Sequence, residues 1–289
     1  MSTTLIELID QQAERLTTAG VSFGHGTLTA FDEAVWLALW AMKLPIDDLD
    51  AVADAPVSSS DQAAVEAIIS ERIATRKPAA YLTREAWLQG VPFYVDERVI
   101  VPRSLIAELL ADGSIDEWLS DETRRVLDLC TGNGSLAVLA AMAYPEVSVV
   151  ASDLSEDALA VARINVDKHN LANRVSLMAS DGLKNITEQF DLILCNPPYV
   201  NAQSMAALPA EYLAEPKMAL ASGEDGMDFT RELLRDVGSH LNPNGILVLE
   251  IGNEVDNFEA AFPNLPVFWL NTSAGESQVL LITAETLQL

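Results

Sequence analysis

The fold of this chain is decided by residues 126–137, which read Val-Leu-Asp-Leu-Cys-Thr-Gly-Asn-Gly-Ser-Leu-Ala. An apolar run of strand length leads into a glycine-rich turn and then into the start of a helix. Gly132 and Gly134 let the backbone approach a ligand closely, and Ala137 lets the helix pack tightly on a sheet. The stretch therefore predicts a strand, a ligand-binding turn and a helix in succession. A tight structural turn without a ligand is the alternative.

Strands and helices alternate from residue 125 onward, which predicts a mostly parallel sheet with right-handed crossovers. We expect strands near 125–130, 147–152, 174–179, 190–195 and 245–251, and helices near 135–143, 155–169 and 228–240. Two further β-like runs, 266–270 and 278–283, are separated by a turn. They predict a terminal hairpin that gives the seven-stranded sheet one antiparallel strand.

The segment before this alternation has a different pattern. Residues 1–77 carry apolar side chains at helical spacing and predict a small helical domain. Residues 78–104 contain short β-like runs on both sides of a glycine and proline turn, and they predict a β-hairpin linker. Residues 105–289 then form the larger domain, so the length of 289 residues is divided between two domains.

Composition restricts the partners of the chain. The formal net charge is −26, from 43 acidic and 17 basic residues, which disfavours binding to free nucleic acid and favours a basic protein partner. A generally acidic surface is the simpler explanation for most of these charges. The N-terminal segment carries Glu7 and Asp10 where a secretory signal would carry basic residues. The longest apolar run, 34–42, is far shorter than the roughly 18 residues of a membrane span. We therefore expect a cytoplasmic protein without a membrane partner.

The cysteines and histidines do not predict a metal site. Cys130 and Cys195 are the two cysteines, and we expect them to be reduced thiols at the ends of neighbouring strands. Our hypothesis is that they lie close together beside the ligand cleft and make activity sensitive to oxidants. The three histidines are scattered and lack the spacing of metal ligands.

Acidic residues follow the second and third predicted strands. Asp153 lies 21 residues after Gly132, and Asp181 precedes Gly182. Because the carboxyl ends of parallel strands meet at one crevice, we expect Asp153 to accept ribose hydroxyls and Asp181 to accept an adenine amine. The pattern also fits a dinucleotide fingerprint. The alternatives are an acid stabilised by a helix dipole at Asp153 and an ordinary turn residue at Asp181.

The fourth predicted strand ends in the sequence Asn196-Pro197-Pro198-Tyr199. Two prolines remove two backbone N–H donors and fix φ, so the carbonyls of Asn196 and Pro197 are free to accept hydrogen bonds. The loop therefore offers acceptors and a flat aromatic face. A proline-stiffened turn with a buried tyrosine is the alternative.

These motifs together resemble the class I S-adenosylmethionine-dependent methyltransferases that act on a planar amide or amine nitrogen. The matching elements are residues 128–134, Asp153, Asp181 and residues 196–199. The resemblance implies an α/β, Rossmann-like catalytic domain with a mostly parallel seven-stranded sheet, preceded by a helical substrate-recognition domain and a β-hairpin.

Additional segments are similar to the protein glutamine methyltransferase family, namely residues 78–83, 85–87, 92–98 and 101–104. The similarity covers nearly the whole chain and is weakest over residues 1–75. Where the branch that modifies peptide release factors typically has Pro-Arg-Pro-Glu-Thr-Glu, this chain has Pro-Arg-Ser-Leu-Ile-Ala from Pro102. That difference favours the branch that modifies ribosomal protein uL3, although Leu105 replaces a proline common in that branch.

The resemblance implies methyl transfer from S-adenosylmethionine to the side-chain amide of a glutamine in uL3, a basic ribosomal protein, with S-adenosylhomocysteine as the product. Three alternatives remain at this point: methylation of release factors, methylation of an adenine amine in nucleic acid, and binding of the cofactor by a ribosome assembly factor without catalysis. A nicotinamide-dependent oxidoreductase would explain the glycine turn and leave residues 196–199 unexplained.

The resemblance also assigns site residues. Catalytic contacts are implied for Asn196, Pro197 and Tyr199, and substrate contacts for these three together with Pro198 and Arg103. Arg103 could instead pair with one of many local acids. The implied cofactor-binding residues, which lie at or after the ends of the first four strands, are Asp128, Thr131, Gly132, Gly134, Asp153, Leu154, Asp181, Gly182 and Asn196.

A last motif, Glu-Ile-Gly-Asn at residues 250–253, follows the fifth strand. It either borders the substrate pocket or forms an ordinary turn from a strand to a helix.

Overall fold

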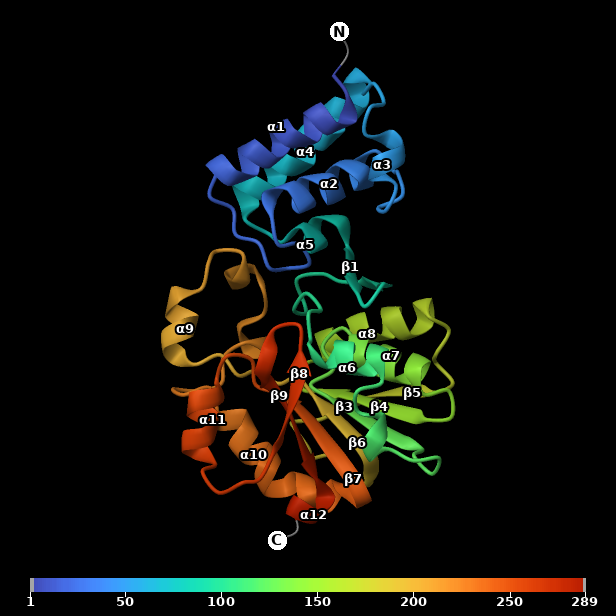
Figure 1. The fold of residues 1–289 in the computed structure, drawn as a ribbon, viewed down its shortest axis with the longest axis vertical. Coiled ribbons are helices and arrows are strands. Elements are labelled where there is room, and N and C mark those ends of the chain that lie inside the picture. The colour runs from blue at the N-terminus through green and yellow to red at the C-terminus, as the bar shows by residue number, and fades with distance from the viewer. Residues whose placement is uncertain (1–2, 288–289) are drawn as a thin grey trace. The chain divides into compact units, whose positions relative to one another are not determined.

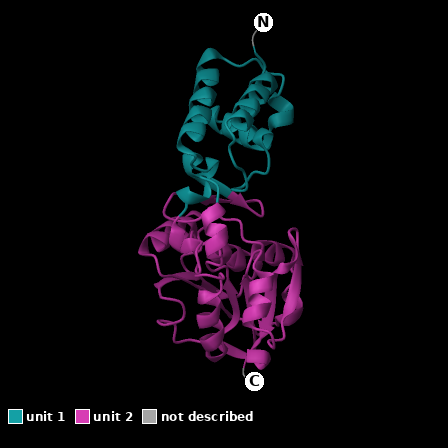
Figure 2. Cartoon of the chain, turned by 90° about the vertical axis from the view of Figure 1, so that its left-hand side faces the viewer, with its two compact units in different colours: residues 1–86, 208–215 teal, residues 87–207, 216–289 magenta. Residues whose placement is uncertain are grey.

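The computed structural model describes residues 3–287, and the chain forms two compact units (Figure 2). One unit comprises Met1–Ala86 together with Leu208–Glu215, and the other comprises Trp87–Ala207 and Pro216–Leu289. The short segment Leu208–Glu215 therefore belongs to the first unit, although the chain on both sides of it belongs to the second.

Helices build the first unit, as its apolar periodicity predicts. They are α1 (Leu5–Thr18), α2 (Ala30–Ala41), α3 (Leu49–Val52), α4 (Ser59–Thr75) and α5 (Ala79–Thr83). A capping box begins α1, because Thr4 Oγ1 accepts a hydrogen bond from the Glu7 amide while the Glu7 carboxylate accepts one from the Thr4 amide. Leu8 and Leu16 of α1, Leu37 of α2 and other apolar side chains are fully buried in this unit.

A buried guanidinium holds the segment Leu208–Glu215 within the first unit. Arg72 of α4 is fully buried, and its Nε donates to Glu33 Oε1 of α2 at 2.8 Å. A second nitrogen of Arg72 lies 3.3 Å from Glu211 Oε1. Burial raises the pKa of Glu33, and the adjacent guanidinium opposes that shift. Arg72 therefore lies between two carboxylates that have little access to water, and Arg76 places a second guanidinium 3.2 Å from Glu211 Oε1.

The two-stranded hairpin that the sequence predicts is present. It consists of β1 (Glu85–Leu88) and β2 (Val91–Tyr94). The apolar run at residues 99–101 follows the hairpin and has no regular secondary structure.

The second unit contains a seven-stranded sheet, as predicted. Its strands are β3 (Arg125–Leu129), β4 (Ser148–Asp153), β5 (Val175–Ala179), β6 (Phe190–Cys195), β7 (Leu241–Glu250), β8 (Phe268–Thr272) and β9 (Gly275–Thr283). The strand order is β5-β4-β3-β6-β7-β9-β8. Pairing is parallel from β5 to β7, whereas β9 runs antiparallel to both β7 and β8. The strand order reverses between β3 and β6, which is where open α/β sheets bind ligands.

Helices cover both faces of this sheet (Figure 1). The first face packs against α6 (Ile106–Asp112), α7 (Ser135–Ala143) and α8 (Glu156–Lys168). The opposite face packs against α10 (Asp228–Asp236) and α11 (Val255–Ala261). Val126 of β3 lies in the first core, whereas Leu127 and Leu129 lie in the second, so the strand is buried on both faces. Two short helices, α9 (Ala202–Ala207) and α12 (Ala284–Leu287), complete the α-helices of the described chain.

Strand β7 begins earlier than the sequence predicts, at Leu241 rather than near residue 245. Its pairing with β6 is interrupted, because Phe190 pairs with Leu241 while Leu192 pairs with Ile246. The residues Pro-Asn-Gly at 243–245, which suggest a turn, form a bulge in the strand, and Asn244 has φ of 68°. Within residues 3–287, every helix is too short or too polar to cross a bilayer.

The buried ion pair predicts a large effect on stability. Arg72→Met keeps the apolar stem and removes the charge that Glu33 and Glu211 share, so we expect a loss of about 3–5 kcal/mol in the free energy of unfolding. Urea unfolding followed by circular dichroism measures the loss. The control is Arg235→Met, because Arg235 pairs with Asp236 on the surface. Equal stability of the two variants would contradict the role assigned to Arg72.

Candidate active site

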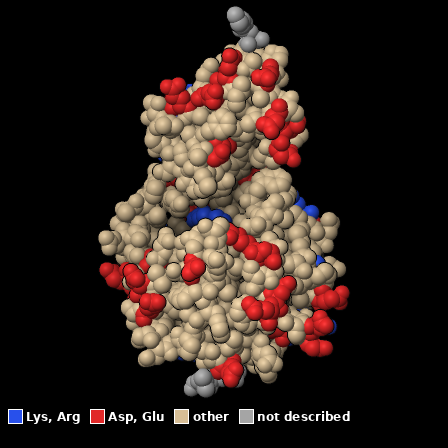
Figure 3. Space-filling view, in the orientation of Figure 1, with Lys and Arg blue, Asp and Glu red and all other residues tan. Residues whose placement is uncertain are grey.

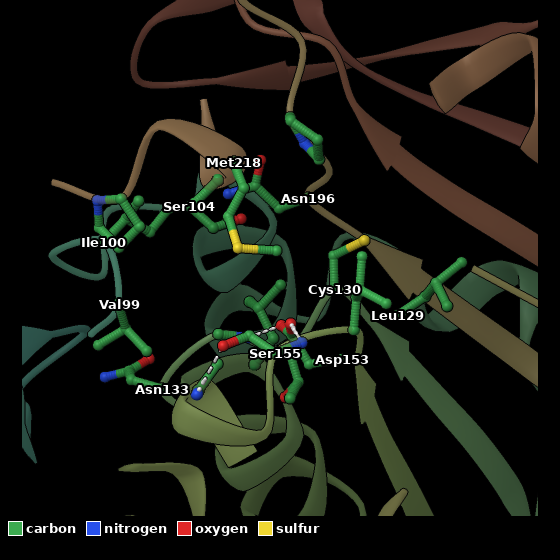
Figure 4. A pocket seen from close by; sticks show the side chains of 18 of the residues that line it. Val99, Ile100, Ser104, Leu129, Cys130, Asn133, Asp153, Ser155, Asn196 and Met218 are labelled. Carbon is green, nitrogen blue, oxygen red and sulfur yellow. Dashed lines mark hydrogen bonds between the residues drawn. The ribbon is translucent and has the colours of Figure 1, made fainter. Parts of the chain in front are cut away.

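The candidate site is a pocket in the second unit, at the carboxyl ends of the parallel strands β5, β4, β3 and β6 (Figure 4). The register of the sheet brings these ends together, since Leu129 of β3 pairs with Ser152 of β4 and with Cys195 of β6. Asp153 pairs in turn with Ala179 of β5. The turns that follow the four strands therefore all open toward the same crevice.

The glycine turn after β3 has the open backbone that the sequence predicts. Gly132 and Gly134 have φ of 55° and 81°. A methyl group added to Gly134 would lie 3.1 Å from the Cβ of Ala162 on α8, so this position needs glycine for both space and conformation. A methyl group added to Gly132 would meet no atom within 4 Å. Gly132 therefore leaves its backbone accessible from the pocket, together with the adjacent Thr131, which also lines it.

Asp128 lies beneath the glycine turn and does not line the pocket. Its Oδ2 accepts hydrogen bonds from Thr131 Oγ1 at 2.5 Å and from the Ala137 amide at 2.9 Å, which joins the turn to the first turn of α7. Burial raises the pKa of Asp128 to about 7, and these hydrogen bonds oppose the shift. Its other oxygen has no hydrogen-bond partner among the described residues. Asp128 is thus placed to shape the turn from below.

Asp153 lines the pocket at the end of β4. Its Oδ2 accepts a hydrogen bond from the Gly132 amide and its Oδ1 accepts one from the Ser155 amide, each at 2.9 Å. Burial raises the pKa of this carboxyl, and the backbone donors oppose that shift. Each carboxylate oxygen can accept a further hydrogen bond, so Asp153 can serve both the turn and a ligand hydroxyl. The adjacent Leu154 also lines the pocket and is more than half exposed.

Asp181 and Gly182 line the pocket after β5. Asp181 forms an ion pair with Lys184, and its hydrogen bond raises the pKa of the lysine. This surface pair contributes little to stability, so the Asp181 carboxylate is available to exchange its partner for a ligand amine. Phe229 at the start of α10 lies beside Gly182 and forms part of the same wall.

The loop after β6 contributes Asn196 and Pro198 to the pocket lining. Pro197 is buried, and Tyr199 is partly buried, with its hydroxyl 3.1 Å from Glu250 Oε1. Backbone hydrogen bonds between Val200 and the segment 220–222 hold the end of the loop. The substrate contacts expected of these residues stay a prediction.

Several lining residues are absent from the sequence-based list. Apolar side chains of the irregular segment before α6, of α7, of the segment before α10 and of α10 itself form walls of the pocket: Val99, Ile100, Pro102, Leu136, Met218 and Phe229. The apolar run at 99–101 is visible in the sequence, whereas Met218 lies in a segment without periodicity. Arg103, which the list includes, lines the pocket and donates to the Val101 carbonyl at 3.0 Å.

The two cysteines are neighbours across β3 and β6. Cys195 is fully buried, Cys130 lines the pocket, and both are free thiols. Burial and the adjacent Cys130 thiol raise the pKa of Cys195, so it is a poor nucleophile at neutral pH. The sensitivity to oxidants stays a prediction.

The sheet order, the glycine turn and the acids at successive strand ends define a class I methyltransferase. The fold is similar to that of the hMettl16 catalytic domain, solved in complex with a MAT2A 3'UTR hairpin, with a TM-score of 0.54 at 14% identity over 75% of this chain and 81% of that one. The family model described as Methyltransferase small domain matches residues 108–227 of this chain. This class of fold implies the use of S-adenosylmethionine.

Curated relatives identify the family. Ribosomal protein uL3 glutamine methyltransferase of Burkholderia pseudomallei is 50% identical over 98% of this chain and 95% of its own length. The proteins of the same name from Bordetella pertussis and Neisseria gonorrhoeae are 50% and 47% identical, over 98% and 99% of this chain and 96% of each relative. The chain therefore belongs to the ribosomal protein uL3 glutamine methyltransferase family.

The raised pKa of Asp128 predicts how stability depends on pH. Because its folded-state pKa of about 7 exceeds the ordinary value of 3.8, the folded chain holds this proton more tightly than the unfolded chain. Asp128 therefore makes the free energy of unfolding fall as pH rises from about 4 to about 7. Asp128→Asn removes this contribution and can still accept at the oxygen facing Thr131. We expect the variant to gain stability relative to the wild type over that range.

Urea unfolding at several pH values measures the difference between the two proteins. Asp256→Asn, which removes an exposed carboxylate from α11, is the matched control. Parallel stability curves for the wild type and Asp128→Asn would contradict the assignment.

Proposed function

We propose that this chain transfers a methyl group from S-adenosylmethionine to the side-chain amide nitrogen of a glutamine in ribosomal protein uL3. The observation that carries the proposal is the position of Asn196. This residue lines the same pocket as the glycine turn and Asp153, and the chain belongs to a family whose curated members bear that activity in their names.

The pocket fits the cofactor in three respects. The backbone at Gly132 is open, so the turn can approach the amino acid part of the cofactor closely. Asp153 retains acceptor capacity for ribose hydroxyls, and Asp181 retains it for the adenine amine. Apolar walls, including Phe229, suit the flat face of the base. When bound, the cofactor supplies an electrophilic methyl group.

The residues of this chain have to make an amide nitrogen reactive. The lone pair of that nitrogen is delocalised into the carbonyl, so it attacks poorly unless the amide is held in line and water is excluded. The Asn196 side-chain oxygen and the Pro197 carbonyl accept hydrogen bonds from the two N–H groups, while the ring of Tyr199 packs against the amide plane. Arg103 contacts the substrate at the pocket wall. The proton leaves after transfer, because the methylated nitrogen is then a strong acid, and water accepts it.

The charge of the chain supports a basic protein as the partner. Acidic side chains predominate on the face drawn in Figure 3, in keeping with the net charge of −26. Such a surface attracts a basic ribosomal protein and repels the phosphates of free nucleic acid. We propose a cytoplasmic reaction, in which residues 1–77 contribute to recognition of the protein substrate.

The experiment supplies purified enzyme with labelled S-adenosylmethionine and, in separate reactions, uL3, a peptide release factor and an adenine-containing RNA. We expect label on uL3, located at a glutamine by mass spectrometry. Label on the release factor alone would show that the release factor, and not uL3, is the substrate. Label on RNA alone would exclude protein methylation.

The role of Asn196 gives a sharper prediction. Asn196→Ala removes the acceptor that orients the amide, so we expect kcat for uL3 to fall about 100-fold. Calorimetry should show cofactor affinity within about fivefold of the wild type, since Asp153 and the glycine turn are untouched and one contact is worth ~1 kcal/mol or less. Asn264→Ala, at an exposed turn, is the matched control. An unchanged kcat with intact cofactor affinity would refute the role of Asn196.

A further inference from the structure

The hydroxyl of Tyr199 is held by a buried carboxylate that the family motif does not include. Glu250 is the last residue of β7, and 3% of it is exposed. Its Oε1 lies 3.1 Å from Tyr199 Oη, at hydrogen-bond distance. The tyrosine hydroxyl donates to this oxygen, which fixes the direction of its O–H bond.

The other oxygen of Glu250 binds a second part of the pocket. Its Oε2 accepts hydrogen bonds from Ser104 Oγ at 2.6 Å and from the Leu105 amide at 2.9 Å. Ser104 lines the pocket on the segment before α6. One carboxylate therefore joins the loop after β6 to the irregular segment at residues 99–105. Burial raises the pKa of Glu250, and the hydrogen bonds from the three donors that surround it oppose this shift.

Two glycines leave the space that the ring and the backbone of Tyr199 occupy. A methyl group added to Gly252 would lie 2.5 Å from Cε2 of the tyrosine ring, and one added to Gly226 would lie 2.2 Å from the Tyr199 carbonyl oxygen. Both glycines also have positive φ, of 55° and 80°. The ring and the backbone of Tyr199 therefore occupy space that other residues would fill. Residues 250–253 are therefore more than an ordinary turn, because Glu250 binds the Tyr199 hydroxyl and Gly252 leaves space for its ring.

We infer that Glu250 is a positioning residue for methyl transfer, which acts by holding Tyr199 and Ser104 in the arrangement that receives the glutamine side chain. The inference rests on the proposed function, because it assumes that Tyr199 faces the substrate amide. Glu250 itself does not line the pocket. Its effect should therefore appear in the rate of transfer and leave binding of the cofactor unchanged.

A double-mutant cycle tests this inference with uL3 as the substrate. Tyr199→Phe keeps the ring and removes only the hydroxyl, and Glu250→Ala removes the acceptor. We expect each variant to lower kcat at least about tenfold, with cofactor affinity within about twofold, because a misplaced reacting group is costly. If Glu250 acts through the tyrosine hydroxyl, the double variant should lose less than the product of the two single losses, by about fivefold.

Glu250→Gln is the conservative variant. Its amide oxygen can accept from Leu105 while its amide nitrogen donates to the tyrosine oxygen, so we expect it to recover part of the activity that Glu250→Ala loses. Glu276→Ala, which removes an exposed carboxylate from β9, is the matched control and should leave kcat unchanged.

The outcomes separate the two claims. If the wild type does not methylate uL3, the proposed function fails. If the wild type methylates uL3 and the losses simply multiply, or cofactor affinity falls in parallel with kcat, the role of Glu250 is refuted. Should Glu250→Ala not fold, Tyr199→Phe decides alone, and a kcat equal to that of the wild type would overturn the inference.

Discussion

The register between β3 and its two neighbours is the constraint on which the rest of the structure depends. Leu129 is paired with Ser152 on one side and with Cys195 on the other, so three strands end at the same level. A shift of one residue in either pairing would turn the apolar side chains of a strand toward the wrong core. The two cores on opposite faces of the sheet therefore fix where the turns begin. The packing of the two cores thus determines the geometry of the site.

The site concentrates carboxylates where water is scarce, and the structure offsets the cost in three ways. Asp128 is stabilised by a hydroxyl and one amide, and its high pKa shows that the compensation is incomplete. Asp153 receives two backbone amides and keeps its outer lone pairs accessible. Glu250 is enclosed by three donors from two segments. The three carboxylates therefore have different roles. Of the three, only Asp153 lines the pocket, so only Asp153 can bind a ligand directly.

Much of this arrangement is encoded locally and can be read from the sequence. Strands buried on both faces appear as short continuous apolar runs, and the acids and the Asn-Pro-Pro-Tyr motif follow those runs directly, so their convergence at one edge could be predicted. The remainder depends on contacts between distant segments. The bond between Tyr199 and Glu250 spans 51 residues, and nothing local to either residue indicates it. Met218 and Phe229 belong to a stretch whose path across the pocket is set by packing, and Pro243 suggests a turn where the strand tolerates a bulge.

The path of the chain has a consequence for the independence of the helical unit. Because Leu208–Glu215 belongs to that unit, the backbone passes between the two units three times, at residues 86–87, 207–208 and 215–216. The third passage lies two residues before Met218, whose side chain lines the pocket. Excision of residues 1–86 would remove both guanidinium groups that pair with Glu211, those of Arg72 and Arg76, while the segment that carries Glu211 stays connected at both ends to the catalytic unit. The helical unit is therefore not a detachable module. Recombination with a different recognition domain would have to exchange two separate pieces of the gene together.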